Sequence, residues 1–146
     1  MKKLLVKDWM TKNPITADPN MGMLGAHKLM RANKIRRLPI VNKRRELVGI
    51  VTRSDIRGAE PSDASTLNIW EMNYLLAQLK LKEMMTRDNL IVCRADDTIR
   101  TAATFLYDNR IGALPVIDDR EKVIGIITES DIFRILISWF NEEVGG

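Results

Sequence analysis

The residues best suited to chemistry occur in a short motif that appears twice in the chain. Its two copies are Thr52-Arg53-Ser54-Asp55 and Thr128-Glu129-Ser130-Asp131. Each copy follows a β-rich apolar run and precedes a helical pattern, so it is expected where a strand ends and a helix begins. A helix N-terminus carries unpaired N–H groups and the positive end of the helix dipole, which together attract phosphate. The motif therefore predicts an anion-binding position at the start of a helix.

The side chains of this motif differ in what they can bind. The hydroxyls of Thr52 and Ser54, and equally those of Thr128 and Ser130, can donate hydrogen bonds to an anion. The carboxylates of Asp55 and Asp131 are poorly suited to phosphate, but they can accept both hydrogen bonds from a ribose diol. The structural alternative is that the serines cap the two helices and the aspartates complement the helix dipoles. Both roles can coexist.

A basic segment precedes only one of two matching Leu-Pro pairs. The two segments are Lys34-Ile-Arg36-Arg37-Leu-Pro39 and Arg110-Ile-Gly112-Ala113-Leu-Pro115. Arginine makes bidentate contacts with phosphate, so Arg36 and Arg37 are candidate phosphate ligands. The alternative is a solvated basic edge. The contrast predicts two unequal sites, with the site nearer Arg36 and Arg37 preferring ligands of higher phosphate charge.

Composition excludes most catalytic and metal chemistries. One histidine, His27, and one cysteine, Cys93, leave no disulfide within the chain, no multi-cysteine zinc site and no Ser-His-Asp triad. We expect no catalytic residues, no metal site and no enzymatic activity. Cys93 is expected to pack as a small apolar residue.

The chain has the composition of a soluble globular protein. It has 146 residues, of which 45% are hydrophobic and 29% charged. The longest nearly apolar stretch, 132–140, is too short to span a membrane, and Lys7 and Asp8 interrupt a signal-like start. We therefore expect a cytoplasmic protein with no membrane association. A net charge of +4 permits an anionic partner without requiring one.

The positions that could do chemistry are carried by an internal repeat. Adding 76 to the residue number converts Leu38-Pro39-Ile40-Val41 to Leu114-Pro115-Val116-Ile117 and aligns the two Thr-x-Ser-Asp motifs. Each repeat is expected to contain a brief strand at Ile15 or Ile91 and then a helix, with Asp18-Pro19-Asn20 and Asp96-Asp97-Thr98 as the helix-start signals. Two strands joined by a polar turn should follow, and then a second helix opened by Ser54 or Ser130. We assign 1–58 to the first repeat, 59–79 to a connector helix and 80–146 to the second repeat.

The connector is expected to form a helix from about Ala64 to Leu79, capped by Pro61-Ser62-Asp63. It is too apolar for a free linker and should pack on the body of the protein or on a partner. The fold class is α+β. Neither repeat alone can easily close a core, so we expect the two sheets to pack against each other about a pseudo-two-fold axis.

The doubled motif resembles a pair of cystathionine-β-synthase (CBS) domains, a Bateman module, over roughly residues 4–58 and 80–140. The connector is similar to stand-alone CBS pairs of the acetoin-utilisation type. The resemblance implies that the motif aspartates recognise ribose in adenosyl ligands and that basic residues before Leu-Pro face ligand phosphates. It also implies a homodimer, because CBS pairs commonly stack into flat discs through their helices.

The expected function is therefore a regulatory module that binds AMP, ADP or ATP, or else S-adenosylmethionine or NAD, between its repeats and signals to an unidentified regulated protein. Two alternatives stay open: a basic nucleic-acid-binding protein, and a purely structural dimerisation module. The expected ligand-binding residues are the motif residues, the strand starts and the segments around Leu-Pro: Ile15, Thr16, Arg36, Arg37, Pro39, Thr52, Ser54, Asp55, Ile91, Val92, Pro115, Thr128, Ser130 and Asp131.

Overall fold

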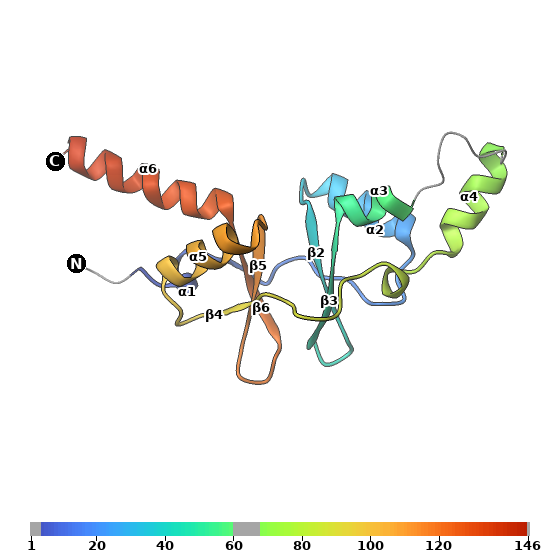
Figure 1. Ribbon diagram of the computed structural model, residues 1–146, viewed down its shortest axis with the longest axis horizontal. Helices are drawn as coiled ribbons and strands as arrows, with labels where there is room; N and C mark the ends of the chain where they lie inside the picture. Colours follow the sequence, from blue (N-terminus) through green and yellow to red (C-terminus); the bar gives the residue numbers. More distant parts are fainter. Residues whose placement is uncertain (1–3, 60–67, 146) are drawn as a thin grey trace. The chain divides into compact units, whose positions relative to one another are not determined.

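A computed structural model describes residues 4–59 and 68–145 and has the α+β composition expected from the sequence (Figure 1). The chain divides into two compact units. One unit is Ile15–Leu90, and the other joins the N-terminal residues up to Pro14 to the segment that begins at Ile91. Each unit contains one antiparallel β-hairpin with helices packed against it.

The hairpin of the Ile15–Leu90 unit consists of β2 (Arg37–Val41) and β3 (Leu47–Thr52). Asn42 stabilises the turn between them, because its Oδ1 accepts hydrogen bonds from the backbone N–H groups of Arg44 and Glu46. Helices α2 (Met23–Ala32) and α3 (Arg53–Ala59) flank the hairpin. The core of this unit is formed by apolar residues from all four elements, including Met23, Ala26, Met30, Leu38, Ile40, Val51 and Ile56.

The other unit repeats this arrangement with a fuller sheet. Its hairpin is β5 (Ala113–Ile117) and β6 (Val123–Thr128), flanked by α5 (Ile99–Asn109) and α6 (Glu129–Gly145). Strands β1 (Thr11–Lys12) and β4 (Cys93–Arg94) extend it to the order β1-β6-β5-β4. Both hairpins have a register shift at the same place, between Ile40 and Val41 and between Val116 and Ile117. The duplication predicted from the sequence is therefore a structural one.

The first segment of each repeat packs in the unit formed mainly by the other repeat. Helix α1 (Val6–Trp9) and β1 lie in the unit of the second repeat, where Thr11 pairs with Ile126. The short helix η1 (Leu81–Glu83) and the residues after it lie in the unit of the first repeat, where Thr86 bridges to Ile50. The compact units therefore have other boundaries than the repeats, which we predict at 1–58 and 80–146. Backbone pairing between distant segments accounts for the difference.

Two local expectations were wrong by a few residues. The strands expected at Ile15 and Ile91 are instead a single bridge from Ala17 to Ile40 and the strand β4 at Cys93. The start signal at Asp18 does not cap α2; Asp18 accepts a hydrogen bond from Asn20 in a local turn, and the N-cap of α2 is Gly22. The second start signal was correct, because Thr98 caps α5 by accepting from Thr101.

The described part of the connector is the helix α4 (Ile69–Gln78). Asn68 caps it by accepting a hydrogen bond from the N–H of Glu71 at 2.8 Å. The cap expected at Pro61-Ser62-Asp63 lies outside the described residues. Leu76 is buried against the first-repeat core, as expected for a connector that packs on the protein. Among the described helices, none has the length and apolar character needed to cross a bilayer.

Two glycines allow the first segment of each repeat, which packs in the other repeat's unit and is called the exchanged segment below, to lie close to the hairpin. A Cβ atom on Gly49 would lie 2.5 Å from Met85 Sδ and 3.0 Å from the carbonyl oxygen of Thr86. At Gly125 a Cβ would meet Met10 Sδ and would lie 3.0 Å from the carbonyl oxygen of Thr11. At Gly49 and at the equivalent Gly125, the backbone of the segment from the other repeat therefore lies too close for a side chain to fit without movement.

We predict that Gly49→Ala and Gly125→Ala each lower the free energy of unfolding by about 1–3 kcal/mol, the range for overpacking a filled site. Urea unfolding followed by circular dichroism measures this. Gly58→Ala is the control, since a Cβ there meets nothing within 4 Å. A helical glycine-to-alanine change should be neutral or stabilise by up to about 1 kcal/mol. Equal urea midpoints for all three variants would contradict the prediction.

Candidate functional site

The first copy of the motif forms a reciprocal pair of hydrogen bonds at the junction of β3 and α3. The N–H of Thr52 donates to Asp55 Oδ2 at 2.8 Å, and the N–H of Asp55 donates to Thr52 Oγ1 at 3.1 Å. This is a capping box, in which side chains satisfy two backbone donors that the start of the helix leaves unpaired. Within the described residues, Asp55 Oδ1 has no hydrogen-bond partner. The half-buried carboxylate of Asp55 thus keeps one oxygen available.

The second copy has the same capping box and two further contacts. Thr128 N donates to Asp131 Oδ2 at 2.8 Å, Asp131 N donates to Thr128 Oγ1 at 3.3 Å, and Thr128 Oγ1 donates to the same Oδ2 at 3.1 Å. Arg134 Nη2 donates to Asp131 Oδ1 at 2.7 Å. Asp131 is only 6% exposed and is the one buried charged residue in the described part of the chain. Both of its carboxylate oxygens are therefore engaged.

The structural role expected for the serines belongs to the threonines instead. Helices α3 and α6 begin at Arg53 and Glu129, so Ser54 and Ser130 lie inside the first turn and are exposed. The capping hydroxyls are those of Thr52 and Thr128. The expectation that Ser54 and Ser130 open the helices was wrong, because threonine and aspartate three residues apart satisfy the helix start reciprocally.

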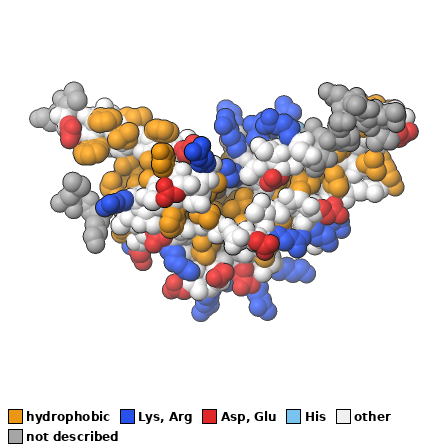
Figure 2. All heavy atoms as spheres, viewed as in Figure 1, with side chains coloured by type: hydrophobic (Ala, Val, Ile, Leu, Met, Phe, Trp, Pro, Cys, Tyr) orange, Lys and Arg blue, Asp and Glu red, His pale blue; other side chains and the backbone are white. Residues whose placement is uncertain are grey.

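The structure brings the basic segment next to the first motif. Arg37 is directly opposite Thr52 in the β2–β3 register, and the carbonyl of Arg36 accepts a hydrogen bond from Arg53 N at 2.9 Å. Figure 2 shows Lys and Arg side chains gathered over β2 and α3. In the second repeat the residue opposite Thr128 is Ala113. The residues that differ in charge between the repeats, Arg37 and Ala113, are thus next to the two motifs.

The strand starts lie beside the Leu-Pro strands. In the first repeat Ala17 N donates to the carbonyl of Pro39 at 3.0 Å, which places the half-buried Ile15 and Thr16 just before the isolated parallel bridge between Ala17 and Ile40. In the second repeat the half-buried Ile91 and Val92 immediately precede β4, which pairs in parallel with β5. Both prolines are buried within their strands. The expected site residues of each repeat therefore lie within one compact unit.

Arg134 contacts the second motif, although no sequence pattern marked it as a site residue. This residue contacts Asp131, donates through Nη2 to the carbonyl oxygen of Trp9 at 3.3 Å, and lies over the Trp9 ring with 5.7 Å between Cζ and the ring centroid. The repeat offset of 76 aligns Arg134 with Gly58, so the difference between the copies was visible in the sequence. The arginine alone does not indicate this contact, because a charged residue on a helix usually faces solvent.

The described residues contain neither a cluster of metal-binding side chains nor a reactive thiol. They hold no cluster of three or more histidine, cysteine, aspartate or glutamate side chains able to bind a metal ion. Cys93 is buried in the second-repeat core, as expected, and burial raises the pKa of its thiol to about 12. A thiol with this pKa stays protonated near neutral pH and is a poor nucleophile.

Comparison with protein families places both repeats in one family. A model of the CBS domain matches residues 6–62 and again 81–138. A curated protein of Methanocaldococcus jannaschii, MJ1426, is 34% identical over 156 residues that include 92% of each chain. The L-aspartate semialdehyde sulfurtransferase of the same organism is 35% identical, but the matched segment spans 90% of this chain and only 23% of that enzyme.

Three solved structures resemble the whole chain. The CBS pair of protein MJ0100, in complex with 5′-methylthioadenosine and S-adenosyl-L-methionine, has a TM-score of 0.77 and 33% identity, covering 94% of this chain and 98% of that one. A putative acetoin utilization protein, AcuB of Vibrio cholerae, has a TM-score of 0.81 and 28% identity, with coverage of 99% and 98%. CBSX2 in complex with AMP has a TM-score of 0.75 and 26% identity, with coverage of 92% and 97%.

Proposed function

Because this chain is a tandem pair that belongs to the CBS domain family, we propose that it is a regulatory module that binds adenosyl ligands. AMP, ADP and ATP are the proposed ligands, with S-adenosylmethionine and NAD as further members of the class. Similar CBS pairs have been crystallised with 5′-methylthioadenosine and S-adenosyl-L-methionine, and with AMP. The observation that carries the proposal is the Asp55 carboxylate, which keeps Oδ1 open at a strand–helix junction beside Arg37.

The proposed site residues divide by chemistry. Asp55 and Asp131 would accept hydrogen bonds from ribose, and the motif hydroxyls and Arg36 and Arg37 would serve phosphate. Residues at the strand starts and the Leu-Pro segments would contact adenine: Ile15, Thr16, Pro39, Ile91, Val92 and Pro115. These roles are supported by the proximity of the strand starts to the Leu-Pro strands and of Arg37 to Thr52 within one unit.

The proposed output is a change of conformation passed to a partner protein. A ligand shifts an equilibrium between two arrangements only by its difference in affinity for them, so binding must differ between the states that the partner distinguishes. We propose no catalytic activity for this chain. Its match to the sulfurtransferase covers 23% of that enzyme, which does not support assigning it that enzyme's reaction.

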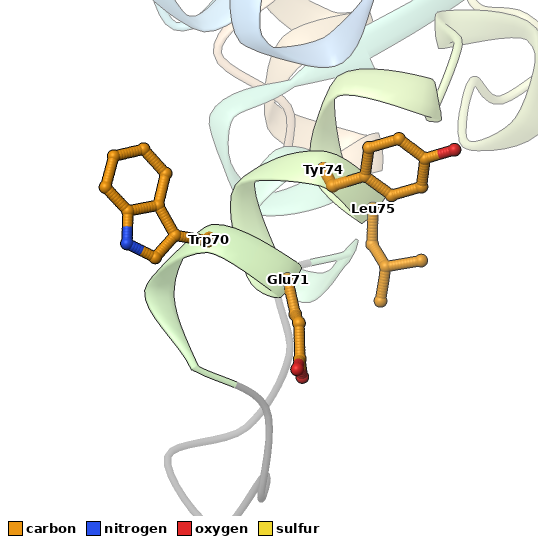
Figure 3. A pocket seen from close by; sticks show the side chains of 4 residues that line it. All are labelled: Trp70, Glu71, Tyr74 and Leu75. Atoms are coloured by element: carbon orange, nitrogen blue, oxygen red, sulfur yellow. The ribbon is translucent and has the colours of Figure 1, made fainter.

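We further propose that the chain forms a homodimer in the cytoplasm, with α6 in the interface. This helix exposes an apolar surface formed by Phe133, Ile137, Trp139 and Phe140, each more than half exposed. Helix α4, in the other unit, exposes Trp70 and Tyr74, which are 80% and 66% exposed. Figure 3 shows Trp70 projecting from one side of this helix and Tyr74 with Leu75 from the other. Apolar surface of this kind commonly marks a protein interface, and a second copy is the occupant we propose.

We predict that Asp55→Ala weakens AMP binding at its own site by about 1–3 kcal/mol, the scale for leaving a polar partner unpaired. Asp131→Ala should weaken AMP binding less, because Arg134 already donates to Asp131 Oδ1. Isothermal titration calorimetry measures this. Asp18→Ala is the matched control, because this aspartate belongs to a turn outside the motif. Unchanged binding in the Asp55→Ala/Asp131→Ala double variant would refute ribose recognition by these residues.

We predict that Arg36→Ala/Arg37→Ala reduces the preference for ATP over adenosine at one site about tenfold, equivalent to ~1.4 kcal/mol. Charge-assisted hydrogen bonds to phosphate are lost while the ribose contact remains. Lys43→Ala/Arg44→Ala, in the exposed turn of the same hairpin, removes equal charge and should leave the preference intact. Retention of the full preference by the Arg36/Arg37 variant at low salt would identify these arginines as surface charge.

We predict a solution mass of about 33 kDa by light scattering at tens of micromolar, twice the chain mass of 16.7 kDa. Ile137→Asp/Phe140→Asp should shift it toward the monomer mass, because two charges would be buried in the interface. Tyr107→Asp, on the 84% exposed tyrosine of α5, is the control and should remain dimeric. A monomer mass for the unchanged chain excludes the dimer.

A further inference from the structure

The two motif aspartates differ in their remaining capacity to accept hydrogen bonds. A carboxylate offers about four lone-pair positions on its two oxygens. Asp131 already accepts from Thr128 N, Thr128 Oγ1 and Arg134. Within the described residues Asp55 accepts only from Thr52 N. A ribose diol donates two hydroxyl groups, so Asp55 has room for both, whereas Asp131 does not while Arg134 is in place.

Arg134 is held in this position by more than one contact. Its bond to Asp131 is short and charge-assisted, at 2.7 Å, and the aspartate side chain is only 9% exposed. The same nitrogen donates to the carbonyl oxygen of Trp9, and the guanidinium lies over the indole ring, an arrangement favourable to a cation. One acceptor position remains on Asp131 Oδ1, so a ribose diol that needs two positions must displace the arginine contact.

The first repeat has no counterpart of this arginine. The aligned residue is Gly58, which has no side chain, and the space around it is open because a Cβ there would meet nothing within 4 Å. The position aligned with Trp9 is Met84, which has no ring to support a cation. The two repeats therefore share the capping box but not the arginine contact.

We propose that Arg134 is a specificity-determining residue that competes with the ribose diol for Asp131, which makes Asp55 the principal ribose site. This inference rests on the proposed adenosyl-binding function. It adds one residue, Arg134, and states that the Asp55 site binds ribose more tightly than the Asp131 site. Arg134 acts through Asp131 in this proposal and not through the ligand phosphate. The signature of such competition is discrimination between ribose and 2′-deoxyribose, because the 2′-hydroxyl is one of the two donors.

The experiment compares dissociation constants for AMP and 2′-deoxy-AMP by calorimetry. The two probes carry the same phosphate, so their ratio cancels any change in attraction to phosphate that follows from removing an arginine. In Asp55→Ala the remaining binding reports on Asp131, and we expect the two nucleotides to bind within about twofold of each other. Adding Arg134→Ala should raise the preference for AMP to about tenfold, or ~1.4 kcal/mol.

The reciprocal variant is Gly58→Arg in the otherwise unchanged chain, with Gly58→Ala as its matched control. An arginine at 58 is three residues from Asp55, as Arg134 is from Asp131. We expect it to lower the AMP preference of the tighter site about tenfold, whereas the alanine leaves it unchanged. If Asp55→Ala does not fold, a two-site titration of Arg134→Ala in the unchanged chain gives the ratio for the weaker site.

The outcomes separate this inference from the function on which it rests. An unchanged ratio in Arg134→Ala overturns the competition. So does loss of binding of both nucleotides in that variant, which would make Arg134 a direct phosphate contact. If the unchanged chain binds none of AMP, ATP and S-adenosylmethionine, the proposed function itself fails, and the arginine contact is then structural only.

Discussion

The reciprocal hydrogen bonds between threonine and aspartate at each strand–helix junction connect the fold of this protein to its proposed site. One carboxylate oxygen is committed to the backbone N–H of the threonine, at 2.8 Å in both copies. This bond starts the helix and fixes the rotation of the carboxylate, so the second oxygen has a defined direction. An aspartate that only recognised a ligand would not need the hydrogen bond from the threonine N–H. The same aspartate therefore serves helix initiation through Oδ2 and is available for other contacts through Oδ1.

Duplication has preserved the framework and changed the side chains on it. Both hairpins shift register at the same position, and both have a glycine, Gly49 or Gly125, where the exchanged segment lies closest. These features are constrained by backbone packing, where a single added carbon atom would overlap a neighbour. Arg37 and Ala113 are opposite the motif threonine in their hairpins, and Gly58 and Arg134 occupy matched exposed places on α3 and α6. The chemistry of the two copies was thus free to diverge without loss of the fold.

The sequence allowed the local elements to be predicted but not their long-range pairing. Helices such as α2 and α5 follow from apolar residues at spacings of three and four, and the hairpins follow from β-rich runs around a polar turn. No local sequence pattern predicts that the first segment of each repeat packs in the other unit, because the pairing of Thr11 with Ile126 joins residues far apart in the chain. The capping assignment failed for a different reason. Threonine and serine both occur at the helix start, and only the hydrogen bonds distinguish them.

Under the proposed function, the differences between the two copies all favour ligand binding at the first repeat over the second. The first repeat combines a carboxylate with an open oxygen and an arginine opposite Thr52, which favours a ligand with both ribose hydroxyls and phosphate. The second repeat combines an engaged carboxylate with an alanine opposite Thr128, which weakens both contacts. A module with two equal sites responds to one ligand over a narrow range of concentration. Two sites separated by ribose and phosphate recognition respond at different concentrations, or to different adenosyl compounds, so the divergence at these four positions would allow one chain to report two chemical signals.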